Sequence, residues 1–81
     1  MTADTVLERL LVLFRGKFGA QTQADDSFST LDIDSLALAE ISVAVEQEFR
    51  VRLTERVLEV NSIRELAQLI HELMLAPVSR R

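Results

Sequence analysis

Apolar residues recur every three or four positions in three stretches of the chain, at about residues 3–16, 35–49 and 62–75. This spacing places them on one face of a helix, because an α-helix turns once in about 3.6 residues. The pattern therefore predicts three α-helices. Residues 51–60 are ambiguous, since their first members alternate as in a strand and their last resemble one helical turn. With no second strand signal nearby, we expect a short helix there.

Residues suited to helix ends flank these stretches. Thr5 and Ser62 each open a capping box at the start of a predicted helix. Asp34 and Ser35 precede the second helix, and either side chain can accept a hydrogen bond from its first turn. Gly16 is placed to end the first helix. The helix boundaries thus follow from local sequence as well as from periodicity.

A long polar loop connects the first two predicted helices, from Gly16 to Asp34. An unanchored loop of this length is unusual in a compact domain. Three apolar residues, Phe28, Leu31 and Ile33, interrupt the polar run. We expect them to hold the loop against the core.

These elements predict an all-α fold, a small four-helix bundle with three main helices and a short third one. A chain of 81 residues is long enough for one core only. We therefore expect a single domain over residues 1–81, folded over about 3–75, with a flexible tail at 76–81. Met1 and the short tail from Pro77 to Arg81 favour a stand-alone protein over a domain of a larger synthase. We also expect a monomer.

Composition excludes several kinds of function. The formal net charge of -4 has the wrong sign for binding nucleic acid or anionic lipid. The chain has no cysteine and one histidine, His71, so a thiolate or zinc site is not expected. We therefore expect no bound metal. No apolar run is long enough to span a bilayer, and Met1 to Asp4 lack the positively charged region of a secretory signal, so a cytoplasmic protein is the default expectation.

The acidic residues gather in the middle of the chain. Between Lys17 and Arg50 there are seven acidic residues and no basic one. Rotation of the second helix by about 100° per residue gives it a core face. That face consists of Leu38, Ile41, Val45 and Phe49. Leu36 and Val43 then point toward solvent in line with Glu40. This arrangement indicates a docking surface for a basic partner. The alternative is an ordinary solvated acidic face.

Ser35 is the serine of chemical interest, because a helix N-terminus favours a bound or attached phosphate. Two other interpretations stay open. Ser35 can be no more than a helix cap. It can also be the nucleophile of a small serine hydrolase, which needs a base beside it, and His71 on the last helix is the only histidine.

A nine-residue segment of the loop and second helix resembles the F-x-x-L-G-x-D-S-L signature of acyl and peptidyl carrier proteins. Its sequence is Phe28-Ser29-Thr30-Leu31-Asp32-Ile33-Asp34-Ser35-Leu36. The order of the predicted helices also matches this family over nearly the whole chain. Two positions depart from the pattern, because Asp32 and Arg50 stand where the family usually has glycine.

The resemblance implies a carrier and not an enzyme. It implies that a Mg²⁺-dependent phosphopantetheinyl transferase attaches 4'-phosphopantetheine from coenzyme A to Ser35, and that the new thiol carries acyl intermediates as thioesters. The pathway would be fatty-acid, polyketide or related specialised biosynthesis. By the same resemblance, six residues meet acyl-loading, condensing and modifying enzymes through their basic docking surfaces: Asp34, Leu36, Ala39, Glu40, Val43 and Glu46.

Two alternatives to an acyl carrier remain at this point. One is an aminoacyl or peptidyl carrier protein, which shares the same signature. The other is an acidic helical interaction module without a prosthetic group, in which Ser35 only caps the helix. Acceptance or refusal of phosphopantetheine at Ser35 separates this second alternative from a carrier.

Overall fold

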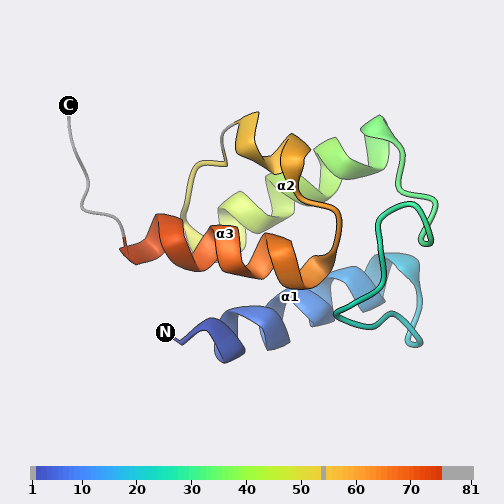
Figure 1. Ribbon diagram of the computed structural model, residues 1–81, viewed down its shortest axis with the longest axis horizontal. Coiled ribbons are helices and arrows are strands. Elements are labelled where there is room, and N and C mark those ends of the chain that lie inside the picture. Colours follow the sequence, from blue (N-terminus) through green and yellow to red (C-terminus); the bar gives the residue numbers. More distant parts are fainter. Residues whose placement is uncertain (1, 54, 76–81) are drawn as a thin grey trace.

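The computed structural model describes residues 2–53 and 55–75 and is all-helical over them. Helix α1 spans Ala3–Phe18, α2 spans Ser35–Phe49 and α3 spans Ile63–Leu75, and a 3₁₀ helix, η1, spans Glu55–Glu59. Figure 1 shows α1 and α3 side by side, with the loop between α1 and α2 closing one end of the molecule. The predicted tail at 76–81 lies outside the described residues.

The prediction of three α-helices is confirmed, but a four-helix bundle is not. Residues Glu55–Glu59 form a five-residue 3₁₀ helix in which no residue is buried. Val57 of this element is partly buried against the core, but 3₁₀ helices rarely exceed four residues, and one this short does not add a fourth helix to a bundle. The described part of the chain contains no named strand, and a single antiparallel bridge joins Ser27 to Ser62.

Helix α1 begins at Ala3, as predicted, but its capping residue and its C-terminal end differ from the sequence prediction. Thr2, not Thr5, is the N-cap, and its hydroxyl accepts a hydrogen bond from the Thr5 backbone N–H over 3.2 Å. The helix continues through Gly16 and ends at Gly19, which has a φ of 119° and donates its N–H to the Arg15 carbonyl. The additional half-turn brings the centroid of the Phe18 ring to 5.6 Å from that of the Phe14 ring. This packing explains why the helix does not end at Gly16.

One hydrophobic core joins the three α-helices and the loop. Helix α2 contributes the face predicted from its periodicity, with Ile41, Val45 and Phe49 buried and Leu38 packed against them. Phe14 of α1 is fully buried and stacks on Phe28 of the loop, with 5.9 Å between ring centroids. The other buried hydrophobic residues are Val6, Leu10, Ile63, Leu66, Ala67, Leu69 and Ile70.

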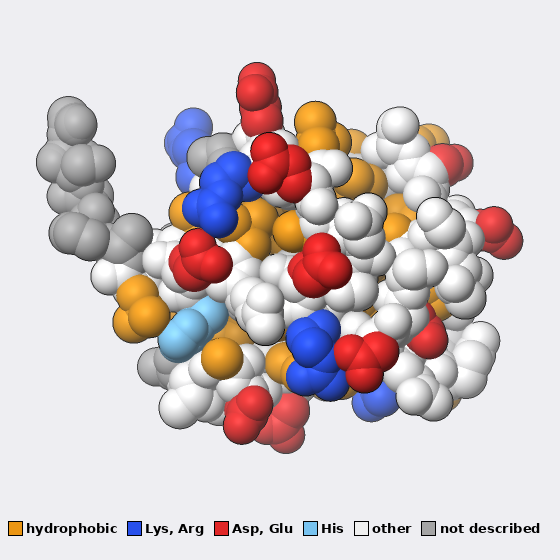
Figure 2. Space-filling model, viewed as in Figure 1, with side chains coloured by type: hydrophobic (Ala, Val, Ile, Leu, Met, Phe, Trp, Pro, Cys, Tyr) orange, Lys and Arg blue, Asp and Glu red, His pale blue; other side chains and the backbone are white. Residues whose placement is uncertain are grey.

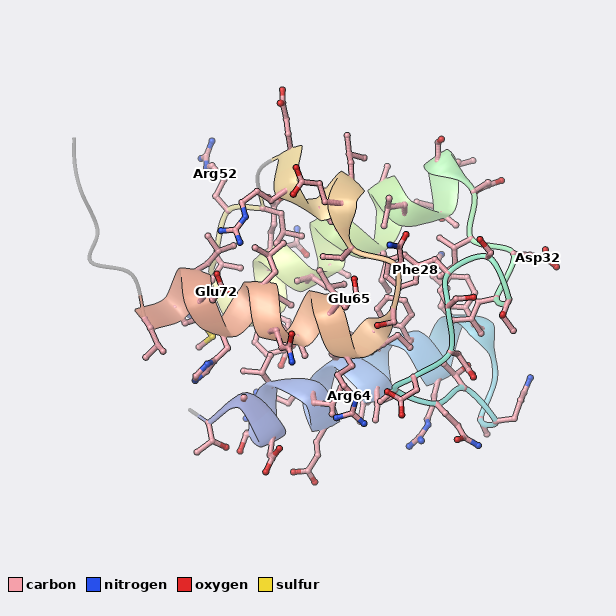
Figure 3. The ribbon with its side chains drawn as sticks, in the orientation of Figure 1. Phe28, Asp32, Arg52, Arg64, Glu65 and Glu72 are labelled. Carbon is pink, nitrogen blue, oxygen red and sulfur yellow. The ribbon has the colours of Figure 1, made fainter. Side chains whose placement is uncertain are left out.

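The long loop is held in place at several points. As predicted, Phe28 is buried and Leu31 and Ile33 pack against the core. Phe28 points into the molecule, whereas Asp32 projects from the outer edge of the loop (Figure 3). The Phe28 N–H also donates to the Asn61 carbonyl over 2.8 Å, which ties the loop to the segment before α3.

An ion pair adds to this attachment. The Arg64 guanidinium donates to the Asp25 carboxylate over 2.7 Å, and the hydrogen bond and the positive charge together hold the pKa of Asp25 below its ordinary value. Sequence gave no sign of this contact, because the two residues are far apart along the chain. The loop therefore presents the start of α2 from a fixed position.

Within residues 2–53 and 55–75, two non-glycine residues adopt left-handed backbone conformations, and both stand where the carrier pattern has glycine. Asp32 has a φ of 57°, and Arg50, the C-cap of α2, has a φ of 55°. A side chain in this conformation is strained by its own Cβ, whereas glycine is not. At both positions the backbone thus adopts a conformation that glycine accommodates without strain.

We expect Arg50→Gly to raise the free energy of unfolding by about 0.5–1 kcal/mol, since relief of the left-handed strain exceeds the entropy that glycine adds to the unfolded chain. Equilibrium urea unfolding would show a higher midpoint with an unchanged slope. Arg52→Gly is the matched control, because Arg52 is exposed and does not have a positive φ. A lower midpoint for Arg50→Gly would contradict the expectation.

Candidate functional site

The N-terminus of α2 is built by Asp34. Its backbone is extended, with a φ of -89°, and its side chain accepts a hydrogen bond from the Ala37 N–H over 2.8 Å. The Leu38 N–H donates to the Asp34 carbonyl over 2.9 Å. Asp34 therefore caps α2, and the Ala37 N–H is the first-turn donor that its side chain satisfies.

Ser35 is the first residue of α2, and its side chain is exposed. No hydrogen bond from its hydroxyl is present among the described residues, because Asp34 performs the capping. This resolves the choice that the sequence left open between the two residues. The interpretation of Ser35 as only a cap is wrong, and its hydroxyl is accessible at a helix N-terminus, where an attached phosphate is favoured.

A small apolar groove lies beside Ser35, between α2 and η1. Its volume is about 150 Å³. It is lined by Ser35, Leu38, Ala39, Ser42, Val57 and Leu58. Neither histidine nor any carboxylate lines it, so no general base for a serine nucleophile is found there. The groove and its two η1 residues, Val57 and Leu58, could not be predicted from the sequence. The groove forms only because η1 lies beside α2 in the folded chain.

The exposed apolar residues of α2 are confirmed where the helical rotation placed them. Leu36 is 68% exposed and Val43 is 53% exposed. Ala39, between them on the helix, is also exposed. Leu58 of η1, at the edge of the groove, is 72% exposed and was not predicted. The surface next to Ser35 is therefore more apolar than the sequence alone indicated.

The acidic side chains of α2 are exposed to different degrees and already have partners within the molecule. The Glu40 carboxylate forms an ion pair with Lys17 over 2.9 Å, and Glu48 forms one with Arg9 over 3.0 Å. Glu46 is half-buried and accepts a hydrogen bond from the Leu53 N–H over 2.7 Å. The acidic surface predicted from charge counting is thus partly neutralised by α1 and partly used to hold the segment after α2.

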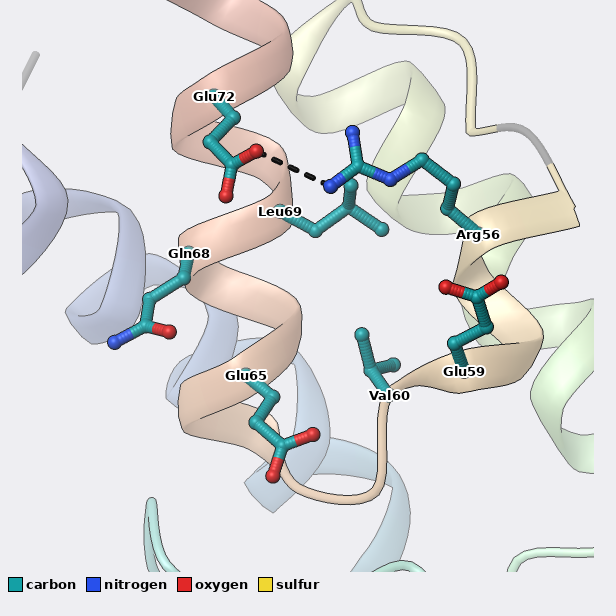
Figure 4. Close-up of a pocket in the computed structure, with 7 residues that line it drawn as sticks. All are labelled: Arg56, Glu59, Val60, Glu65, Gln68, Leu69 and Glu72. Atoms are coloured by element: carbon teal, nitrogen blue, oxygen red, sulfur yellow. Dashed lines mark hydrogen bonds and ion pairs between the residues drawn. The ribbon is translucent and has the colours of Figure 1, made fainter.

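Acidic and basic side chains are also interleaved on the face of the molecule drawn in Figure 2. A second hollow, of about 220 Å³, lies there between η1 and α3. Arg56 crosses it to form an ion pair with Glu72 over 3.1 Å, and Glu65 accepts from the Asn61 N–H (Figure 4). This hollow shares no lining residue with the groove beside Ser35. Arg56, Glu65 and Glu72 therefore have partners within the chain.

Two further features bear on the sequence predictions. The described residues contain no group of three or more acidic, histidine or cysteine side chains placed to hold a metal ion. Within the same residues no helix has the length and apolarity to cross a membrane. His71 lies half-buried on α3, away from the groove lining.

Comparison with known proteins gives one family. A family model described as "Phosphopantetheine attachment site" matches residues 8–70, which is most of the chain. The matched region runs from α1 through the groove and into α3. A search among curated proteins finds no match.

Proposed function

The chain belongs to the family of phosphopantetheine-binding carrier domains, and on this premise we propose that it is an acyl carrier protein that bears its prosthetic group on Ser35. Domains of this family are sites of covalent 4'-phosphopantetheine attachment and are not enzymes themselves. They interact with phosphopantetheinyl transferases and with biosynthetic enzymes. For this chain we propose which residue carries the group, which cargo it holds and which partners it meets.

The observation that carries the assignment to Ser35 is its free, exposed hydroxyl at the start of α2. Asp34 caps the helix, so modification of Ser35 removes no hydrogen bond of the fold. The first turn of α2 after Asp34 contains no acidic side chain, and the Asp34 carboxylate itself accepts a hydrogen bond from the Ala37 N–H. The residues at this position therefore fit the group.

When bound, 4'-phosphopantetheine supplies the thiol that holds a substrate as a thioester, which a chain without cysteine lacks. The protein's own contribution is positional. The attachment of the loop through Phe28 and the Asp34 cap hold Ser35 at the molecular surface. The apolar groove beside it is suited to an aliphatic segment, which favours an acyl cargo over an aminoacyl one. Fatty-acid, polyketide and related specialised pathways all use such cargo.

The proposed partner surface is centred on the exposed side chains that follow Ser35. Leu36, Ala39 and Val43 supply apolar contact, and Glu40 supplies charge for enzymes with basic docking surfaces. Asp34 and Glu46 belong to the same surface, but each already accepts a hydrogen bond from a backbone N–H. Their contribution to docking is therefore smaller than that of Glu40.

The proposal is tested by incubating the protein with coenzyme A, Mg²⁺ and a broad-specificity phosphopantetheinyl transferase. We expect one phosphopantetheinyl adduct per chain in the intact mass, and fragmentation of the modified chain should locate it at residue 35. An acidic interaction module predicts no adduct on the folded protein with any of several transferases, and that result would overturn the proposal.

A further inference from the structure

Four carboxylates flank or belong to α2, and their partners fall into two kinds. Asp34 and Glu46 accept hydrogen bonds from backbone N–H groups, over 2.8 and 2.7 Å. Glu40 and Glu48 instead pair with the side chains of Lys17 and Arg9, both on α1. Backbone partners cannot leave without distorting the chain, whereas side-chain partners can rotate into solvent. The two ion pairs are therefore the exchangeable contacts of this surface.

The Lys17–Glu40 pair is built to exchange. Lys17 is in the last turn of α1, and its ammonium lies 2.9 Å from a Glu40 carboxylate oxygen. The two side chains are 38% and 53% exposed, so water screens their attraction. A pair of this kind contributes little net stability, because solvation of the separated charges nearly replaces the contact. A second cation can therefore replace Lys17 at little cost to the fold.

The position of Glu40 distinguishes its ion pair from the other. Glu40 is little more than one helical turn from Ser35, among the exposed side chains of Ala39 and Val43. Glu48 lies eight residues further along α2, about 12 Å from Glu40 at the rise of an α-helix. An enzyme that docks around Ser35 is therefore closer to Glu40 than to Glu48.

We propose that Lys17 is a built-in competitor for Glu40, which a lysine or arginine of the docking enzyme must displace. The inference rests on the proposed function, since it assumes docking on α2 beside Ser35. Exchange of one cation for another at the same carboxylate keeps Glu40 paired in the free and the bound carrier. Lys17 therefore weakens the attraction of α2 for basic partners, which suits a carrier that must leave each enzyme after delivery.

The test is the rate of phosphopantetheine transfer at varied concentrations of the carrier, with the enzyme, coenzyme A and Mg²⁺ held constant. Lys17→Gln should lower the KM for the carrier about two- to fivefold with little change in kcat, because it removes a weak competing ion pair. Arg9→Gln is the matched control. It removes the same charge and the equivalent pair with Glu48, and its KM should stay close to that of the unsubstituted protein.

A second variant pair shows whether Lys17 acts through Glu40. Glu40→Gln should raise the KM, and addition of Lys17→Gln to it should then have no further effect. An equal fall in KM for Lys17→Gln and Arg9→Gln would overturn the inference, since net charge would explain it. A rise in KM for Lys17→Gln would also overturn it, because Lys17 would then contact the enzyme itself. If the unsubstituted protein takes up no phosphopantetheine, the proposed function fails and this inference fails with it.

Discussion

Ser35→Ala should abolish phosphopantetheine attachment, with no adduct detectable under conditions that modify the unsubstituted protein fully. The substitution removes the only atom of this residue that can form the phosphodiester. It should leave the fold intact, because the Ser35 hydroxyl makes no hydrogen bond among the described residues and Asp34 remains as the helix cap. Intact mass spectrometry measures the adduct, and far-ultraviolet circular dichroism confirms the helical content.

Ser29→Ala is the matched control for this prediction. Ser29 is an exposed serine of the loop, but it lies outside the helix N-terminus and away from the groove. Its replacement should leave the adduct unchanged. An adduct that persists on Ser35→Ala, or that disappears on Ser29→Ala, would assign the attachment to another hydroxyl and contradict the proposed site.

Phe14→Ala should lower the free energy of unfolding by about 3–5 kcal/mol, the largest stability change expected in this protein. Phe14 is fully buried in the core. The centroid of its ring lies 5.6 Å from that of Phe18 and 5.9 Å from that of Phe28, on which it stacks. Removal of the Phe14 ring therefore leaves a cavity between α1 and the loop. The free energy of unfolding of small domains is about 5–15 kcal/mol, so a loss of this size leaves much of the Phe14→Ala population unfolded.

Urea unfolding followed by circular dichroism measures this change, with Phe14→Leu as a milder variant where alanine leaves too little folded protein. Val12→Ala is the control on the same helix, because Val12 is 69% exposed and its truncation should change stability by less than about 0.5 kcal/mol. A Phe14→Ala variant as stable as Val12→Ala would show that the loop does not depend on the aromatic contact.

The effect of Phe14→Ala should extend to the functional site. Phe28 connects the Phe14 ring to the segment that leads into α2, since the Ile33 N–H donates to the Phe28 carbonyl over 3.0 Å. Loss of the ring contact frees this segment and with it the position of Ser35. The site is therefore held by the core and not by local sequence alone.

Local sequence predicted the helices well and their ends less well. The core face of α2 and the exposure of Leu36 and Val43 followed from rotation around one helix, which needs no knowledge of neighbouring elements. The end of α1 did not follow, because Gly16 and Gly19 both offer a helix stop and only the contact of Phe18 with Phe14 decides between them. A short helix was expected within residues 51–60, and the structure has a five-residue 3₁₀ helix there, Glu55–Glu59, which does not make a four-helix bundle.

The sequence by itself determined the all-helical class, the family and the candidate attachment residue. These depend on periodicity and on a contiguous motif, both of which are local properties. The structure decided between Asp34 and Ser35 as the cap, through a contact between residues three apart. Tertiary packing alone decided that η1 forms a groove beside Ser35 and that Lys17 pairs with Glu40. The groove and the ion pair join residues from separate helices, and only packing of the core determines which side chains then come within a few ångströms of each other.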